Sequence, residues 1–316
     1  IWGTPTGLLA NATYTVYANN SGGSSSATFT LGLNWTLIPS AEGAYITRNS
    51  SIGNGISFQY NASSASGSGS SPGFANTNNK VSTLFFTTCA ILDNGDLKCW
   101  GRDYAGQLGD GGTNTDVSAP SSTAINLGTG RTAVAVSSGG YHTCAILDNG
   151  DLKCWGRDNN GQLGNGGSNT NTNAPSSTAI NLGTGRTAVA VSTGAYHTCA
   201  ILDNGDLKCW GWGARGQLGH GATTNLNSPP STAINLGTGR TAVAVTAGAD
   251  HTCAILDNGD LKCWGYDSNG QLGDGGSNAN KNSPPSTAIN LGTGRTAVAV
   301  SAGEAHTCAI LDNGDL

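Results

Sequence analysis

The cysteines are the residues whose type and spacing most clearly imply chemistry. Nine are present, and eight of them form pairs with nine residues between the two thiols. Zinc sites usually hold two cysteines within two to four residues of each other and need four converging ligands, whereas these pairs recur one per repeat. We therefore expect disulfides, and with them an oxidising compartment. The expected disulfides are Cys89–Cys99, Cys144–Cys154, Cys199–Cys209 and Cys253–Cys263.

Four histidines stand two residues before a cysteine in successive repeats and raise the question of a metal site. Copies related by the rotation of a repeat would lie on a wide ring, so we interpret them as structural hydrogen-bonding groups. The loop from Asp110 to Asp116 has oxygens at a spacing suggestive of calcium. The other copies have Asn165, His220 and Asp274 in place of Asp110, so the carboxylates become fewer, which favours a solvated turn. We expect no metal and no cofactor. The histidines are His142, His197, His251 and His306.

The acidic residues that recur do not form a catalytic site. Asp93 and Asp96 occur identically in every unit, which is typical of turn residues, whereas a glycosidase needs two close carboxylates in one unique place. The Asp-box of sialidase-type propellers has a tryptophan three residues after its Asp-x-Gly, and here Trp100 stands farther from Gly95. We therefore expect that this chain is not an enzyme.

The paired cysteines belong to a stretch, TCAILDNGDLKCWG, that recurs every 54 or 55 residues. A fixed period of this length indicates a solenoid, a propeller or an array. The sequence contains no Met and ends inside a fifth copy, so we interpret it as a piece of a longer protein and Cys308 as half of an unfinished pair. The complete copies are Thr88–Gly101, Thr143–Gly156, Thr198–Gly211 and Thr252–Gly265.

The cysteine spacing also predicts the geometry of a hairpin. If Asp93, Asn94 and Gly95 form a three-residue loop with glycine in a left-handed bulge, Cys89 and Cys99 lie directly opposite each other. Opposed residues have Cβ atoms close enough for a disulfide after modest adjustment. A two-residue Asn-Gly turn would place the two cysteines on opposite faces, so the spacing favours the three-residue loop.

The composition indicates an all-β chain. Only 10% of the 316 residues are charged, glycine numbers 49, and no stretch carries apolar residues at helical spacing. Such a composition suits many short strands joined by tight turns. A net charge of −5 without a cluster of Lys and Arg argues against nucleic acid as a partner. The absence of any run of about 18 apolar residues predicts that no segment spans a membrane as a helix.

The N-terminal part differs from the repeats. Residues 1–38 contain two alternating stretches, Thr13–Ala18 and Ala27–Leu33, and together with GTPTG at Gly3–Gly7 they resemble the last strands of bacterial and archaeal immunoglobulin-like surface modules. They are interpreted as the end of an antiparallel β-sandwich. Residues 39–79 are interpreted as connecting strands and a Ser/Gly/Asn-rich linker. Five sequons are candidate glycosylation sites, or arise by chance in an Asn/Ser/Thr-rich chain: Asn11, Asn19, Asn34, Asn49 and Asn61.

Residues 80–316 carry the repeats, and each complete unit predicts four strands. Ala133–Val136 is apolar on both faces, as expected of an inner strand between neighbouring sheets. Thr143–Leu147 and Leu152–Trp155 form the hairpin, and Ser177–Leu182 is a weaker outer strand. Four strands in some 55 residues predict the blade of a β-propeller, so that this chain would hold a partial propeller of about four to five blades.

The stretch GGYHTCAILDNGDLKCWGRDNNGQLG at Gly139–Gly164 resembles the repeat of the regulator of chromosome condensation family. The resemblance implies a seven-bladed β-propeller, a fold whose members act as exchange factors for a nuclear GTPase, light receptors, ubiquitin-ligase accessory domains and inhibitors of secreted enzymes. The fold therefore does not determine the function. The first unit departs from the pattern at Lys80–Cys89, where the Ser-x-Gly-x-x-His element is missing, and we interpret it as a capping blade.

The positions that vary between the repeats lie in loops, and several of them bear residue types enriched in binding hot spots. Equivalent loops of a propeller lie on one face, so we expect these residues to share a rim that binds a partner. The alternative is neutral drift in exposed loops. The candidate rim residues are Tyr104, Tyr141, Tyr196, Trp212, Arg215, Asp250, Tyr266 and Glu304.

These observations predict a non-catalytic, secreted or cell-surface scaffold for recognition or adhesion, whose loops bind a protein or a glycan. The leading alternative is a structural protein whose repeats self-assemble into an array or filament through the open edges of the blades. A guanine-nucleotide exchange factor is a third reading, but it requires an intracellular setting that the paired cysteines oppose.

Overall fold

The computed structural model describes residues 80–316 except residue 168, and the backbone of five strands in the N-terminal part. The chain divides into two compact units, residues 1–71 and 72–316. No helix occurs in the part of the chain that the structure describes. The expectation of an all-β chain is therefore confirmed.

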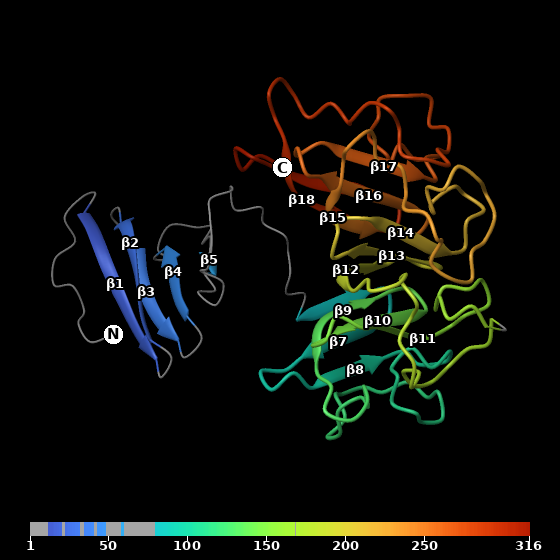
Figure 1. Ribbon diagram of the computed structural model, residues 1–316, viewed down its shortest axis with the longest axis horizontal. Helices are drawn as coiled ribbons and strands as arrows, with labels where there is room; N and C mark the ends of the chain where they lie inside the picture. The colour runs from blue at the N-terminus through green and yellow to red at the C-terminus, as the bar shows by residue number, and fades with distance from the viewer. Residues whose placement is uncertain are drawn as a thin grey trace. The chain divides into compact units, whose positions relative to one another are not determined.

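The N-terminal unit contains two antiparallel sheets. One consists of β1 and β2, and the other has the order β3-β4-β5 (Figure 1). The immunoglobulin-like identity of residues 1–38 and the boundaries at 38 and 79 stay predictions, and the five sequons lie outside the residues whose side chains are described. The strands are β1 (Ala12–Asn20), β2 (Gly23–Leu31), β3 (Trp35–Ser40), β4 (Gly43–Arg48) and β5 (Phe58–Gln59).

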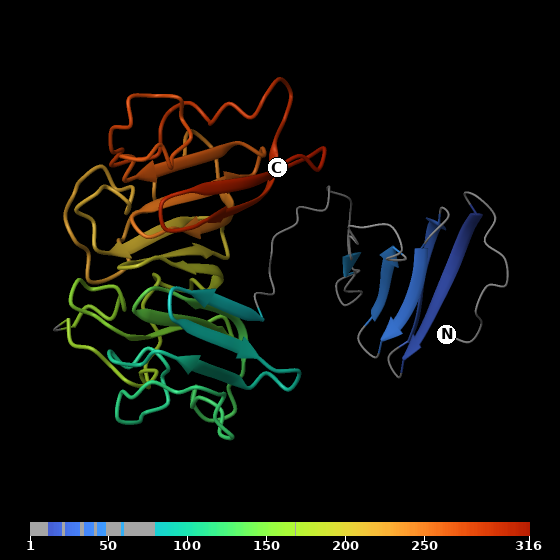
Figure 2. The same cartoon turned by 180° about the vertical axis from the view of Figure 1, so that it is seen from behind.

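The second unit is a series of five antiparallel sheets, here called blades 1 to 5, which follow one another in chain order (Figures 1 and 2). The first strand of blades 2 to 5 is the inner strand, and it packs beside the inner strands of its neighbours. Blade 1 is β6 (Val81–Leu84), β7 (Thr87–Ile91) and β8 (Leu97–Gly101); blade 2 is β9 (Ala133–Ser138), β10 (His142–Leu147) and β11 (Leu152–Gly156); blade 3 is β12 (Ala188–Thr193), β13 (His197–Leu202) and β14 (Leu207–Gly211); blade 4 is β15 (Ala242–Ala247), β16 (His251–Leu256) and β17 (Leu261–Gly265); blade 5 is β18 (Ala297–Ala302) and β19 (Thr307–Leu311).

The hairpin of each blade has the register that the cysteine spacing predicted. In blade 2, Cys144 lies opposite Cys154 and the two form a disulfide, as do the three equivalent pairs. The loop closes with a hydrogen bond from the amide of Leu147 to the carbonyl of Asp151 at 2.9 Å. Gly150 occupies the bulge at φ 82°, a backbone conformation that favours glycine. The three-residue loop is therefore confirmed.

The predicted outer strand at Ser177–Leu182 is wrong. This segment forms no ladder, and one amide, that of Ile180, donates to the carbonyl of Leu152 at 2.9 Å. Local side-chain bonds satisfy the neighbouring backbone instead, since Thr178 N donates to Ser176 Oγ and Gly183 N to Asn181 Oδ1. Ser and Asn side chains compete with sheet formation in this way. Blades 1 to 4 therefore have three strands, with an isolated bridge, Gly156 to Thr172 in blade 2, at the outer edge.

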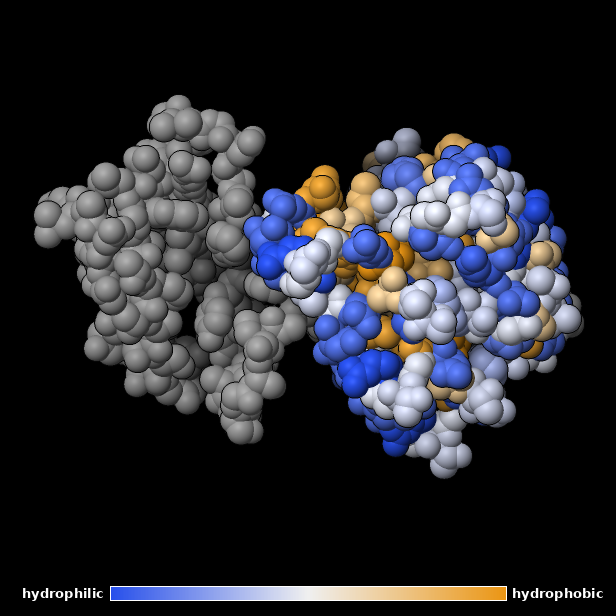
Figure 3. Space-filling model, turned by 90° about the horizontal axis from the view of Figure 1, so that it is seen from above, coloured by the Kyte–Doolittle hydropathy of each residue, from blue (hydrophilic) through white to orange (hydrophobic). Residues whose placement is uncertain are grey.

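The hydrophobic core lies between the blades. The cluster that joins blades 2 and 3 contains Cys144 and Leu163 of the former and Trp210 of the latter, and Trp210 is fully buried. The stretch TCAIL is buried throughout β16 but half-exposed in β19, where no following sheet covers it among the described residues. Figure 3, seen from the side of blade 5, shows apolar side chains among polar ones. The middle strand of each blade is thus buried by the blade that follows it.

A backbone carbonyl in the Gly-Gln-Leu-Gly loop links each blade to the following one. The carbonyl of Gln162 in blade 2 accepts hydrogen bonds from Thr198 Oγ1 at 2.8 Å and Trp210 Nε1 at 3.1 Å, both in blade 3. A Cβ atom on Gly164 would lie 2.4 Å from the indole nitrogen of Trp210, so glycine is required at this position. The same arrangement recurs at Gln107 with Thr143 and Trp155, and at Gln217 with Thr252 and Trp264.

The repeated histidines complete this link. His142 Nε2 lies 2.7 Å from Thr198 Oγ1 and, because that hydroxyl already donates to Gln162, the histidine must donate its Nε2 proton. Its buried Nδ1 has no hydrogen-bond partner among the described residues, so a second proton there would be buried and unpaired, and the ring is a neutral imidazole. Burial lowers the pKa of His142 to about 3. The interpretation of the histidines as structural hydrogen-bonding groups is confirmed for His142, His197 and His251, the last two through the contacts His197–Thr252 and His251–Thr307. For His306 it stays a prediction.

These histidines predict a loss of stability in acid. Burial lowers the pKa of His197 to about 3 and that of His251 to about 4, below the usual 6.5, so the unfolded chain binds protons more readily. Stability should be full above pH 6.5 and fall as the pH drops toward 4, by about 2–3 kcal/mol per histidine near pH 4.5. Glutamine is a donor that does not titrate. Replacing His197 by Gln should therefore lower, by about one, the number of protons that the protein takes up when it unfolds in acid. Chemical denaturation from pH 7 to 4.5 measures this uptake, and an identical pH dependence in H197Q would contradict it.

Candidate functional site

Two loops of each blade meet at one rim and position the candidate binding residues. The residue after Trp-Gly donates its amide to the carbonyl of the residue before the hairpin strand, as Arg157 does to Tyr141 and Trp212 to Tyr196, each at 2.9 Å. Arg102 and Tyr266 make the same bond, to Phe86 and Asp250. This repeated bond places side chains from the two loops side by side in every complete blade.

Four of the predicted rim residues form a continuous line across blades 1 to 3, which we call the aromatic row: Tyr104, Tyr141, Tyr196 and Trp212. The rings of Tyr141 and Tyr196 are stacked with centroids 4.8 Å apart. Tyr104 meets Tyr141 edge-on at 5.9 Å, and Trp212 meets Tyr196 edge-on at 5.9 Å. Offset and edge-to-face arrangements are the favourable geometries for aromatic pairs, so each ring holds its neighbour in place.

Two arginines lie over this row. The guanidinium carbon of Arg157 lies 5.3 Å from the ring centroid of Tyr141 and 5.4 Å from that of Tyr196. Arg102 lies 4.5 Å from the ring of Tyr104 and also 5.0 Å from that of Phe86. These distances fall within the range of cation–π attraction. The sequence interpretation missed both arginines, although they follow Trp-Gly at the same position as Trp212.

The electrostatics of the row combine neutral hydroxyls with fixed positive charge. Burial, followed by a hydrogen bond with Tyr141, raises the pKa of Tyr196 to about 12, while the charge of Arg157 acts in the opposite direction. Tyr196 therefore keeps its proton at physiological pH. The row offers a partner aromatic faces, phenol groups and two guanidinium groups that cannot lose their charge.

The other four predicted rim residues lie in blades 3 to 5 and have a different character. Arg215 places its guanidinium carbon 4.5 Å from the ring centroid of Tyr266. Burial raises the pKa of Asp250, the Arg215 charge lowers it and Glu304 raises it, so these charges lie close enough to interact. The structure thus divides the eight candidates into the aromatic row and a mixed-charge group of Arg215, Asp250, Tyr266 and Glu304.

The acidic loop that suggested calcium behaves as a turn in the structure. Asp110 Oδ1 accepts a hydrogen bond from the amide of Gly112 at 2.7 Å. Within the described part of the chain, no three His, Cys, Asp or Glu side chains come together as metal ligands could. A search of the same residues for a helix long and apolar enough to cross a membrane finds none.

Comparison with known proteins identifies the repeats. A family model described as regulator of chromosome condensation (RCC1) repeat matches residues 94–146, 149–201, 204–255 and 258–310, and a second RCC1 repeat model matches 133–162, 188–217 and 242–271. The chain is 30% identical to the ultraviolet-B receptor UVR8 of Arabidopsis thaliana over 227 residues, which cover 72% of this chain and 49% of the receptor. It is 32% identical over 203 residues to the mitochondrial RCC1 domain-containing protein RUG3 of the same plant, covering 61% of this chain and 43% of that protein.

Solved structures share the fold. Prp20p of Saccharomyces cerevisiae superposes with a TM-score of 0.61 at 19% identity, over 72% of this chain and 54% of that one. Human WBSCR16 gives a TM-score of 0.64 at 20% identity, over 86% and 68%. These likenesses confirm the propeller fold. The chain spans about half the length of the curated relatives described above.

A buried aspartate of blade 1 lacks a hydrogen bond that the equivalent aspartate of blade 2 makes. Asp103 is 1% exposed, and its Oδ1 accepts the amide of Leu108 at 2.8 Å while its Oδ2 has no hydrogen-bond partner among the described residues. In blade 2 the equivalent Oδ2 of Asp158 accepts a hydrogen bond from Asn165 Nδ2 at 3.2 Å. Asp110 stands in the place of Asn165 and cannot donate as a carboxylate. Burial, together with the charge of Asp110, raises the pKa of Asp103 to about 6.

Asp110→Asn should stabilise the protein at neutral pH. The pKa of Asp103 is raised from 3.8, so its contribution to stability is full below pH 3.8 and is lost as the pH rises through 6. An asparagine would give Oδ2 a donor, as in blade 2, and we expect a gain of about 1–2 kcal/mol at pH 7 and a smaller gain at pH 4. Chemical denaturation at both pH values tests this, with Asn165→Asp as the reciprocal control that should destabilise at pH 7. Equal stability of D110N and the parent at pH 7 would refute the argument.

Proposed function

This chain belongs to the regulator of chromosome condensation (RCC1) repeat family, and on that premise we propose that it is a non-catalytic β-propeller scaffold that recognises another protein through the aromatic row. The observation that carries the proposal is the unbroken contact of Tyr104, Tyr141, Tyr196 and Trp212 across three blades. Tyr, Trp and Arg dominate binding hot spots, and this rim supplies all three.

The row suits recognition because its side chains are ordered before a partner arrives. Stacked and edge-on rings together with arginines held over them have little rotamer freedom left to lose, which lowers the entropic cost of association. Tyr104 is 43% exposed and Tyr141, Tyr196 and Trp212 are half-buried, so each ring offers a free surface while its other side is supported. The positive charge of Arg102 and Arg157 favours a partner whose contact surface carries acidic and apolar groups.

Proteins of the same fold are consistent with a protein partner. The yeast protein Prp20p has been described for its binding to Gsp1p and histones, and it has been crystallised with Kap60. These partners belong to Prp20p. They support the proposal only in that a propeller of this fold can present a protein-binding surface.

We further propose that the protein works in a secreted or cell-surface setting, and the four disulfides support this. Disulfides persist in oxidising compartments and are rare where thiols are kept reduced. Family relatives include a mitochondrial protein, so family membership leaves the compartment open and the disulfides carry this part of the proposal.

The redox state of the native protein tests the compartment. In protein isolated from its own source, with thiols blocked at lysis, we expect four intact disulfides, and reduction should add two hydrogen atoms per pair to the intact mass. Protein that is reduced before alkylation is the control, because all eight thiols of the four pairs are then labelled. Free thiols in the four pairs would overturn the secreted setting and favour an intracellular scaffold.

The aromatic row is tested by binding. The propeller would be used to capture partners from secreted proteins of its source, with cross-linking mass spectrometry to locate the contact. Tyr196→Ala removes a ring that contacts both neighbours, and it should weaken binding of the captured partner about thirtyfold, the effect of a hot spot worth about 2 kcal/mol. Tyr266→Ala, an aromatic change outside the row, is the matched control and should alter the affinity less than threefold. Cross-links away from the row, or equal affinities of Y196A and Y266A, would refute the proposal.

A further inference from the structure

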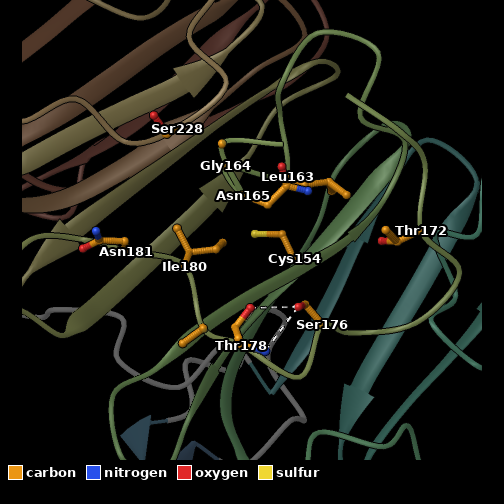
Figure 4. Close-up of a pocket in the computed structure, with 12 residues that line it drawn as sticks. Cys154, Leu163, Gly164, Asn165, Thr172, Ser176, Thr178, Ile180, Asn181 and Ser228 are labelled. Atoms are coloured by element: carbon orange, nitrogen blue, oxygen red, sulfur yellow. Dashed lines mark hydrogen bonds between the residues drawn. The ribbon is translucent and has the colours of Figure 1, made fainter. Parts of the chain in front are cut away.

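A pocket of about 270 Å³ lies at the outer edge of blade 2, away from the aromatic row. Its floor is apolar and includes the disulfide sulfur of Cys154 together with Leu163 and Ile180. Two outer loops of blade 2 and Ser228 of the next blade form its walls (Figure 4). Its volume is near the lower end for small-molecule sites, so it has room for one small unit.

Thr172 distinguishes this pocket from the equivalent places in neighbouring blades. It forms the outer bridge with Gly156, and the same bridge is made by Val117 in blade 1 and Leu226 in blade 3. Those apolar side chains pack against core clusters. Thr172 lines the pocket with a smaller and polar side chain, and its buried hydroxyl has no hydrogen-bond partner among the described residues. A buried hydroxyl without a partner costs about 1–3 kcal/mol, which a ligand would recover by bonding to it once the Thr172 side chain turns about χ1 toward the pocket.

The rest of the lining is polar but uncharged. Ser176 Oγ and Thr178 Oγ1 lie 3.1 Å apart, and either hydroxyl can donate. Figure 4 marks this hydrogen bond with a dashed line. Asn165, Asn181 and Ser228 add amide and hydroxyl groups. No Asp, Glu, Lys, Arg or His lines the pocket, so a charged ligand would be buried there without a counter-charge, at a high desolvation cost.

We propose that this pocket binds one uncharged sugar residue. A pyranose ring has one face of C–H groups, which matches the Cys154–Ile180 floor, and a periphery of hydroxyls, which matches the Ser, Thr and Asn walls. Thr172 is the residue that confers selectivity, because its hydroxyl is the group that a ligand must satisfy. The inference goes beyond protein recognition by the aromatic row and does not depend on it.

Ligand-observed NMR with the whole chain tests the proposal. The probes are free neutral hexoses and N-acetylhexosamines, oligosaccharides that end in the same sugars, and a uronic acid as the charged comparison. We expect saturable binding of at least one neutral sugar and none of the uronic acid. Thr172→Val, the residue that blade 1 carries at this place, should weaken binding about tenfold, as the loss of one hydrogen bond requires. Thr172→Ser, which keeps the hydroxyl, should bind within threefold of the parent.

The outcomes distinguish a free sugar from the terminal residue of a glycan, and they show whether the proposal fails. Binding of free sugars supports a soluble ligand, and binding of oligosaccharides alone supports the terminal residue of a glycan. Thermal unfolding of T172V verifies that the variant is folded, and unchanged partner capture by T172V shows that the aromatic row is intact. The proposal is overturned by no saturable binding of any neutral sugar, by equal binding of the uronic acid, or by equal affinities of T172V and T172S.

Discussion

A single backbone oxygen determines how the blades are joined. The carbonyl of Gln162 accepts hydrogen bonds from the hydroxyl of Thr198 and the indole of Trp210. The imidazole of His142 donates a hydrogen bond to that same hydroxyl. Four groups from two blades thus share one buried network that leaves the imidazole neutral. The close packing of the tryptophan against glycine follows from this geometry, and so does the rigid spacing of loops on the rim.

This network separates positions that must stay the same from positions that can vary. Hairpin residues serve both the disulfide and the next blade, so they recur without change across the complete repeats. The link between the two rim loops of a blade uses main-chain atoms, as in the bond from Arg157 N to the carbonyl of Tyr141, so the side chains at these positions can differ from blade to blade. The stacking of Tyr141 on Tyr196 is one outcome of that freedom, and the charged group around Asp250 is another.

Much of the fold could be predicted from the sequence because it rests on local rules. The cysteine spacing was sufficient to establish the hairpin register, since the period of a strand leaves one way to oppose Cys89 and Cys99. The strand at Ser177–Leu182 was predicted wrongly because local Ser and Asn side-chain bonds take the place of strand pairing there. The contacts of Gln162 escaped prediction because they use its main chain, and those of Arg157 because they depend on the distance between blades.

Because the contacts between neighbouring blades repeat, the number of repeats in such a chain can change during evolution. Every complete unit presents the preceding one with the same threonine and tryptophan, and the following one with the same glutamine carbonyl. Recombination between two copies, which would delete or duplicate one 54- or 55-residue unit, would therefore create a junction identical to those already present. The number of blades can then change without a misfit at joints like those between blades 2, 3 and 4, while the order of side chains along the rim changes by one unit at a time.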